Sequence, residues 1–135
     1  RAVLAKSKLN VVLATRDFLI TPELIAAKYE VPTQRLVFPP YSALYWNYAF
    51  GAGNGETYLE FKAYAERMLL GYENIRIFDF QNAPFVTDLN NYKDYTHYAP
   101  EINDRMLGCF ASGEYLVTEA ASRAELLERY PQIPE

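Results

Sequence analysis

Residues 75–80 read IRIFDF, and this apolar run predicts a buried β-strand. A second run, RLVF at residues 35–38, ends in Pro39-Pro40 and predicts another strand from which the chain leaves sharply. Between them, residues 57–70 carry apolar side chains at helical spacing. A strand, a helix and a strand in this order form a βαβ unit, which implies a parallel pair with a right-handed crossover. The predicted fold class is therefore α/β, as part of a three-layer arrangement in which helices flank a parallel sheet.

The helix between the two strands is predicted from its caps and its apolar face. Thr57 and Glu60 fit a capping box, and Gly71 is placed to end the helix that they begin. Apolar residues recur three and four positions apart and define the face that should be buried: Tyr58, Phe61, Ala65, Met68, Leu69 and Tyr72.

Two more helices are predicted after the second strand. One opens at Pro100 and stops at Gly113, because proline suits the first helical turn and glycine the residue after the last one. Its expected buried face consists of Ile102, Met106, Leu107 and Phe110. Ser122 and Glu125 form a second capping box, which predicts a short helix that ends before Pro131.

The patterns before and around the first strand are less regular. Residues 10–14 read NVVLA and fit either a short buried strand or the end of a helix. Thr21, followed by a proline, predicts the start of a helix that runs to about Tyr29. Residues 41–46 (YSALYW) are expected to form an aromatic loop or a single helical turn. A flexible link is expected at three glycines, Gly51, Gly53 and Gly55.

Composition narrows the class of protein. The 135 residues fit one domain, and half of them are apolar, which is enough for a packed core. The net charge of −4 argues against a nucleic-acid partner, which requires a basic face. No apolar run approaches the roughly 18 residues of a membrane span. Cys109 is the only cysteine, so it allows no intrachain disulfide and is expected to be a small core residue.

These elements divide the chain into three parts. Residues 1–34 form an N-terminal helical and strand segment, residues 35–112 the βαβ-loop-helix core, and residues 113–135 a C-terminal helical extension. The chain begins with Arg1 rather than Met, so the natural gene product is expected to extend upstream.

The chemistry is expected in the loop after the second strand, because ligands bind beyond the carboxyl ends of the strands in an open α/β sheet. This loop contains Asp94-Tyr95-Thr96-His97, with the only histidine in the sequence. An Asp three residues before a His can fold back and accept a hydrogen bond from the ring Nδ1–H. That bond leaves Nε2 free to take a proton from a nucleophile. The competing interpretation is that His97 only caps or packs against the helix that begins at Pro100.

The order strand, helix, strand, D-x-x-H loop and helix resembles the C-terminal third of the SGNH (GDSL-like) hydrolase and acyltransferase superfamily, over about residues 35–112. The resemblance implies a flavodoxin-like fold in which Asp94 and His97 are the last two members of a catalytic triad. Residues 38–42 (FPPYS) also look like the end of a strand in related bacterial proteins, some of which are associated with modifying cell-surface polysaccharides.

The resemblance makes the chain a fragment of an ester hydrolase or O-acyltransferase that acts on acylated cell-surface polysaccharide. The side chains expected to line its substrate site are Tyr41, Ser42, Tyr95 and Tyr98. No cofactor is implied, and the bacterial cell envelope or periplasm is favoured over the cytoplasm.

The sequence departs from the family pattern where the nucleophile should be. It contains neither the Gly-Asp-Ser motif that carries the serine nor a Gly-x-Asn-Asp segment for the oxyanion hole. Ser42 lies near the expected carboxyl edge but lacks a Gly-x-Ser-x-Gly context, so it is expected to cap a turn. We therefore expect a missing N-terminal half, or self-association, to cover an exposed edge of the strand at residues 36–38.

Two alternatives remain at this point. With 12 Tyr, 8 Phe and one Trp, the chain fits a non-catalytic module whose aromatic loops, residues 41–48 and 92–98, bind a glycan or a protein partner. A divalent ion among Asp79, Asp88, Asp94 and His97 is the weaker alternative, because Asp in loops more often forms turns and the spacing does not force a site. No metal is predicted.

Overall fold

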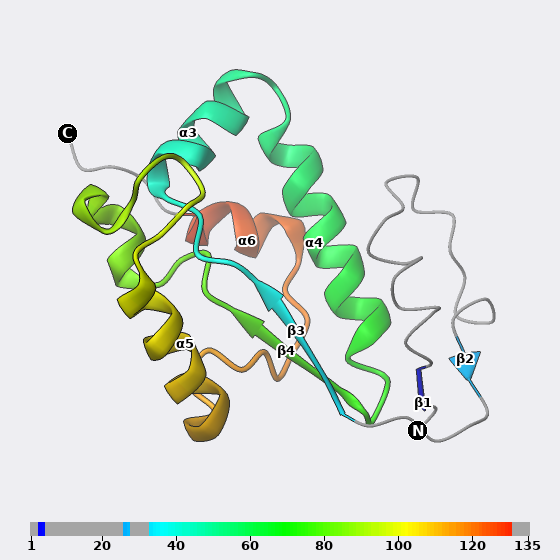
Figure 1. Cartoon of the computed structure of the whole chain (residues 1–135). Coiled ribbons are helices and arrows are strands. Elements are labelled where there is room, and N and C mark those ends of the chain that lie inside the picture. Colours follow the sequence, from blue (N-terminus) through cyan, green and yellow to red (C-terminus); the bar gives the residue numbers. More distant parts are fainter. Residues whose placement is uncertain (1–2, 5–25, 28–32, 131–135) are drawn as a thin grey trace.

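A two-stranded parallel sheet lies between helices in the computed structural model of this protein (Figure 1). Strands β3 (Gln34–Phe38) and β4 (Ile75–Asp79) pair in parallel, with Leu36 opposite Ile77. The pairing confirms the predicted parallel unit and the α/β class. The structure describes residues 3–4, 26–27 and 33–130.

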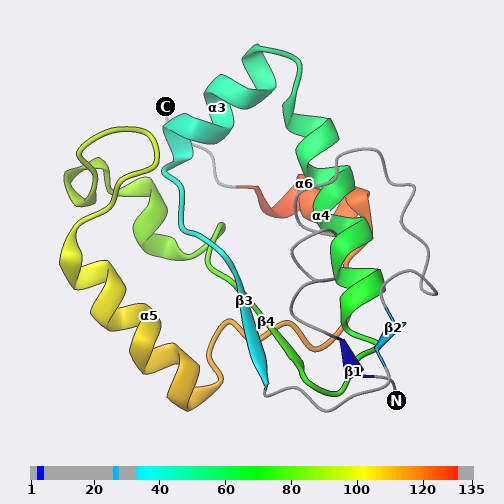
Figure 2. The same cartoon turned by 45° about the vertical axis from the view of Figure 1, so that its right-hand side comes forward.

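The two faces of the sheet pack against different helices. Side chains alternate along β4, so Ile77 packs with the residues of α4 (Gly55–Leu69) and Phe78 with those of α5 (Pro100–Ser112). Figure 2 shows α4 and α5 on opposite sides of the strands. The same alternation places Asp79, at the end of β4, on the face that α4 covers.

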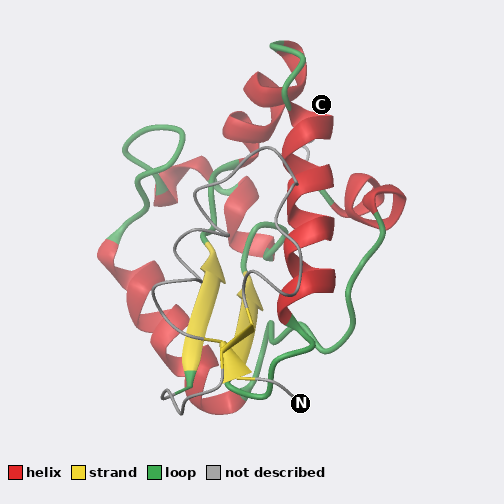
Figure 3. Ribbon diagram, turned by 90° about the vertical axis from the view of Figure 1, so that its right-hand side faces the viewer, coloured by secondary structure: helices red, strands yellow, loops and turns green. Residues whose placement is uncertain are grey.

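A third apolar cluster lies beyond the carboxyl ends of the strands. It joins α3 (Ala43–Gly51) and α6 (Arg123–Arg129) to α4 through the buried side chains of Trp46, Leu59 and Leu126. Figure 3 shows α4 running alongside the strands. Each such large apolar side chain contributes about 1.5–3 kcal/mol when it is fully buried.

Residues 41–46 do not form the loop or single turn that the sequence suggested. Residues 43–46 belong to α3, a helix of nine residues that begins at Ala43. Ser42 is its N-cap, and the Ser42 hydroxyl accepts a hydrogen bond from the Tyr45 amide at 3.4 Å. The N-cap and the burial of Trp46 against α4 and α6 stabilise a helix in a segment for which the sequence predicted a loop or a single turn.

The three glycines do not form a flexible link: Gly51 ends α3, Gly53 lies in the short turn, and Gly55 begins α4. Gly53 adopts a φ of +80°, and Gly55 is buried where a Cβ atom would collide with the ring of Phe50. The predicted capping box at Thr57 is wrong, because α4 begins three residues earlier, with Asn54 instead of Thr57 as its N-cap.

The buried face of α4 differs from the predicted apolar stripe. Three residues of that stripe, Tyr58, Phe61 and Met68, are only half-buried. Lys62 and Glu66 are buried in their place, because α4 is covered by the sheet on one side and by α3 and α6 on another. The residues of this helix that the structure buries are Gly55, Leu59, Lys62, Ala63, Ala65, Glu66 and Leu69.

Helix α5 has the predicted bounds but a slightly rotated buried face. Ile102, Met106 and Cys109 are buried, which confirms Cys109 as a core residue. Leu107 was expected on that face but is 61% exposed, because it lies one residue, about 100° of helix rotation, away from Met106. Gly113 ends the helix with a φ of +81°, as the glycine signal predicted.

The segment after α5 contributes to the core. The Asp79 amide donates to Tyr115 O at 3.0 Å, and the Val117 amide donates to Ile77 O at 2.8 Å, so this segment lies along β4. The predicted capping box of α6 is confirmed, with Ser122 and Glu125 bonded reciprocally. Strand β4 is thus flanked on both edges, whereas β3 is the edge strand among the described residues of this sheet.

A second, small antiparallel pair joins β1 (Val3–Leu4) to β2 (Ala26–Ala27). The helix predicted from Thr21 to about Tyr29 is wrong at Ala26–Ala27, where backbone pairing with β1 replaces helical hydrogen bonds. The rest of that helix, and the element predicted at residues 10–14, lie outside the described residues. Within the described part of the chain, no helix has the length and apolar character to cross a membrane.

Candidate functional site

Asp94 and His97 form a close side-chain pair in the loop between β4 and α5. The His97 Nδ1 atom lies 2.7 Å from Asp94 Oδ2 and 2.9 Å from Asp94 Oδ1. Among the described residues, Nε2 of His97 makes no hydrogen bond. The geometry therefore matches a carboxylate that orients an imidazole through Nδ1–H and leaves Nε2 available.

The pair lies on the surface. The His97 side chain is 75% exposed and the Asp94 side chain 51% exposed. The ring is thus not packed against α5, which removes the packing interpretation of His97. Water around an open pair weakens its electrostatic influence, so a working catalytic site here requires a covering surface.

Backbone hydrogen bonds fix the Asp94 carboxylate. Its Oδ1 atom accepts bonds from the amides of Thr96 at 3.0 Å and His97 at 2.9 Å. These bonds, together with the side chain of His97, lower the pKa of Asp94 to about 2. The carboxylate is therefore ionised and held in place at every physiological pH.

The loop that carries the pair is tied to the chain that leaves β3. The Tyr92 hydroxyl donates to Pro40 O at 2.6 Å. Burial is the main cause that raises the pKa of Tyr92 to about 12, and the neighbouring Tyr98 contributes to the same shift. The Ser42 amide donates to Tyr95 O at 3.0 Å. Segments that follow two neighbouring parallel strands therefore meet at the carboxyl edge of the sheet, where ligands bind in such folds.

Ser42 is a structural part of this connection. It has no exposed surface, and its hydroxyl donates to Tyr95 O at 2.9 Å besides capping α3. A hydroxyl enclosed in this way does not reach a substrate in this structure. Its position agrees with the expected turn cap rather than with the expected substrate contact or a nucleophile.

The expected tyrosines differ in their exposure. Tyr95 is 47% exposed, and its ring centroid lies 5.9 Å from that of Tyr48, which is 63% exposed. Tyr41 and Tyr98 are half-buried, and the pKa of Tyr98 is raised by burial and by the neighbouring Tyr41. Tyr48 was not named individually as a predicted site residue. It was included only in the aromatic loop predicted at residues 41–48.

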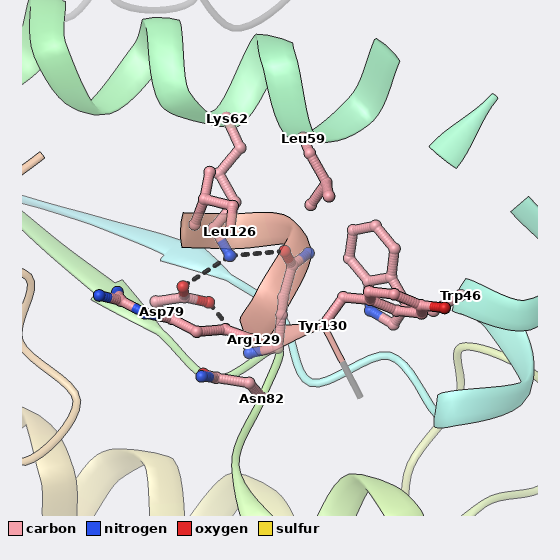
Figure 4. A pocket seen from close by; sticks show the side chains of 9 residues that line it. Trp46, Leu59, Lys62, Asp79, Asn82, Leu126, Arg129 and Tyr130 are labelled. Carbon is pink, nitrogen blue, oxygen red and sulfur yellow. Dashed lines mark hydrogen bonds and ion pairs between the residues drawn. The ribbon is translucent and has the colours of Figure 1, made fainter. Parts of the chain in front are cut away.

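Sequence reasoning missed a second polar cluster at the end of β4 (Figure 4). Lys62 Nζ lies 2.6 Å from Asp79 Oδ2 and 3.0 Å from Gln81 Oε1, and it also lies 4.9 Å from the centroid of the Phe38 ring. No role was predicted for Lys62 from the sequence. A signal existed, since Lys62 lies three residues before Ala65 and seven before Leu69, on the face that is buried.

The four residues weighed for a metal do not gather. Asp79 pairs with Lys62, and Asp88 accepts bonds from the amide and side chain of Asn90 within its own turn. Over residues 33–130 no three His, Cys, Asp or Glu side chains lie together where they could hold an ion. Comparisons of the chain with protein-family models, with curated proteins and with solved structures find no match.

Proposed function

We propose that the Asp94–His97 pair is the base and its orienting carboxylate in an ester hydrolase or acyltransferase of the SGNH type. The observation that carries the proposal is the Nδ1–carboxylate contact of 2.7 Å, with Nε2 directed to no described partner. The carboxylate would hold the tautomer with a proton on Nδ1 and stabilise the imidazolium, while Nε2 takes the proton of a serine hydroxyl.

This chain does not supply the nucleophile. Ser42 is enclosed, and the sequence contains no Gly-Asp-Ser motif. The serine and the oxyanion hole would come from a segment outside these 135 residues, as part of a larger flavodoxin-like sheet. The exposure of His97 supports this, because a catalytic imidazole requires a surface that excludes water from it.

The face of β3 offers a place for such a segment. Leu36, Phe38 and Leu69 help line an apolar groove of about 300 Å³ of empty space, solvent at its mouth included. Further strands of the same domain would cover this groove and pair with the outer edge of β3. Self-association across that edge is the competing arrangement. The molecular mass of a longer protein in solution distinguishes the two, because coverage by its own strands leaves a monomer and self-association gives an oligomer.

The proposal is tested by reaction of the longer protein with a fluorophosphonate, which labels an activated serine. His97→Ala should slow labelling roughly 10²- to 10⁴-fold, the usual contribution of a general base. Asp94→Asn should slow it as well. Asp88→Asn is the matched control, because Asp88 makes the same kind of turn in the same loop but contacts Asn90 instead of His97. Equal labelling of all four proteins rejects the proposal.

One observation favours a non-catalytic function, the binding of a glycan. Tyr48 and Tyr95 present neighbouring exposed rings from α3 and from the Asp94–His97 loop. Exposed aromatic faces stack on sugar rings without any need for a triad. A glycan array in which wild type binds and Tyr48→Ala does not, with no fluorophosphonate labelling of the longer protein, supports this second function over the first.

A further inference from the structure

Two exposed tyrosines from distant parts of the sequence lie next to each other. Among the tyrosines of residues 33–130, only Tyr48 and Tyr95 are exposed, at 63% and 47%. Their ring centroids are 5.9 Å apart, with an angle of 45° between the ring planes. Tyr48 belongs to α3 and Tyr95 to the loop that carries Asp94 and His97. The pair is therefore a tertiary contact between two elements.

The backbones beneath this contact are held together. Tyr48 lies within α3, and Ser42 is the N-cap of that helix. The amide and the hydroxyl of Ser42 both donate to Tyr95 O, at 3.0 and 2.9 Å. Ser42 has no exposed surface, so water does not compete for these bonds. The two rings can therefore turn about their side-chain bonds while their backbones stay in place.

Phenol rings held this close can be joined by one-electron oxidation. A peroxidase with hydrogen peroxide takes one electron and one proton from each hydroxyl, and the peroxide is reduced to water. Each ring is left as a tyrosyl radical whose unpaired electron is shared with the carbons ortho to the oxygen. Two such carbons, one from each ring, form a carbon–carbon bond. Each ortho hydrogen then moves to its own oxygen, so both phenols are restored and the net loss is two hydrogen atoms.

Exposure distinguishes this pair from the other tyrosine pairs. The centroids of Tyr41 and Tyr45 are 4.6 Å apart and those of Tyr45 and Tyr58 are 6.4 Å apart, but these three residues are half-buried. A peroxidase is itself a macromolecule, so it oxidises rings that project into solvent. Coupling also requires two radicals side by side before either decays. Within the described chain, Tyr48 and Tyr95 are the tyrosines that meet both conditions.

We propose that Tyr48 and Tyr95 are an oxidative cross-linking site, at which a peroxidase and hydrogen peroxide join the two rings as dityrosine and fasten α3 to the loop that carries His97. The bond closes a loop over residues 48–95, which restricts the unfolded chain. The melting temperature should therefore rise by roughly 5–10 °C. The proposal rests neither on catalysis by the Asp94–His97 pair nor on glycan binding.

The test treats dilute protein with a heme peroxidase and hydrogen peroxide and separates the products on a denaturing, reducing gel. The carbon–carbon bond survives the thiol reductant, whereas a disulfide of Cys109 does not. The expected product is a single chain with dityrosine fluorescence and an intact mass lower by two hydrogen atoms. Trypsin should release residues 36–62 and 94–105 as one linked peptide, and its fragmentation should place the link at Tyr48 and Tyr95.

Three phenylalanine variants show which rings react. Tyr48→Phe and Tyr95→Phe each remove one phenol and keep the ring, so dityrosine in the single-chain band should fall to background. Tyr45→Phe is the matched control, because Tyr45 lies on the same helix but is half-buried, and the yield should be unchanged. Thermal melts compare the linked chain with equally treated Tyr48→Phe, which separates the effect of the link from other oxidation. Circular dichroism verifies the fold of each variant.

Several results would overturn the proposal. They are a link found only between different chains, a link confined to residues 36–62, and an absence of dityrosine while free tyrosine reacts under the same conditions. Equal yields in wild type and Tyr48→Phe would overturn it as well. A linked chain that melts at the same temperature as treated Tyr48→Phe would overturn the fastening of α3 to the loop.

Discussion

Replacing Lys62 by Met removes the ammonium group of a buried ion pair while keeping much of the apolar stem. Lys62 and Asp79 have side chains that are 7% and 15% exposed, with 2.6 Å between Nζ and Oδ2. In Lys62→Met the Asp79 carboxylate keeps only the Gln81 amide as a donor, and Gln81 Oε1 loses its own donor. An uncompensated buried charge of this kind costs about 3–5 kcal/mol.

We expect a loss of about 3 kcal/mol in the free energy of unfolding, at the low end of that range because Asp79 keeps some contact with water. For a domain of this size the melting temperature should fall by roughly 10 °C. The double variant Lys62→Met, Asp79→Asn should recover part of the loss, because no unpaired charge remains. Urea unfolding followed by circular dichroism of wild type, Lys62→Met, Asp79→Asn and the double variant yields the interaction energy of the pair.

Arg123→Met provides the control for this experiment. It breaks the ion pair of Arg123 with Glu56, whose side chains are 49% and 63% exposed. Exposed pairs contribute about 0–1 kcal/mol, so this variant should be close to wild type. Equal losses in Lys62→Met and Arg123→Met, or a double variant less stable than Lys62→Met alone, would refute the assignment of Lys62 and Asp79 as a buried, coupled pair.

Three further predictions follow from the same structure. Ser42→Ala removes the N-cap of α3 and its bond to Tyr95 O, and urea unfolding should show a loss of about 1–3 kcal/mol. The pKa of Asp94 is about 2 in the folded loop, below the ordinary value of 3.8 for an aspartate. Its stabilisation is therefore present above pH 4 and lost as the pH falls through 2, which amide chemical shifts of His97 should follow. Gly113→Ala forces alanine to a φ of +81° and should cost about 1 kcal/mol, whereas Gly108→Ala, inside α5 with open space around it, should be neutral or stabilising in thermal melts.

The amino-acid sequence alone determined the elements whose signals are local. The apolar runs at β3 and β4, the proline and glycine that bound α5 and the capping box at Ser122 all predicted the observed elements, because each depends on neighbouring residues. The spacing of Asp94 and His97 likewise suggested a contact that the coordinates place at 2.7 Å, since three residues of loop suffice to bring the groups together.

Tertiary packing decided which faces are buried. The stripe expected on α4 was shifted, and Leu107 was placed on the wrong face of α5, because a helix covered by several neighbours has no single apolar side that periodicity can identify. Helix α3 extends through residues read as a loop because Ser42 caps it and Trp46 is buried against α4 and α6. The pairing of Lys62 with Asp79 joins residues 17 positions apart in different elements, and only the docking of α4 on the sheet brings their charges within 2.6 Å.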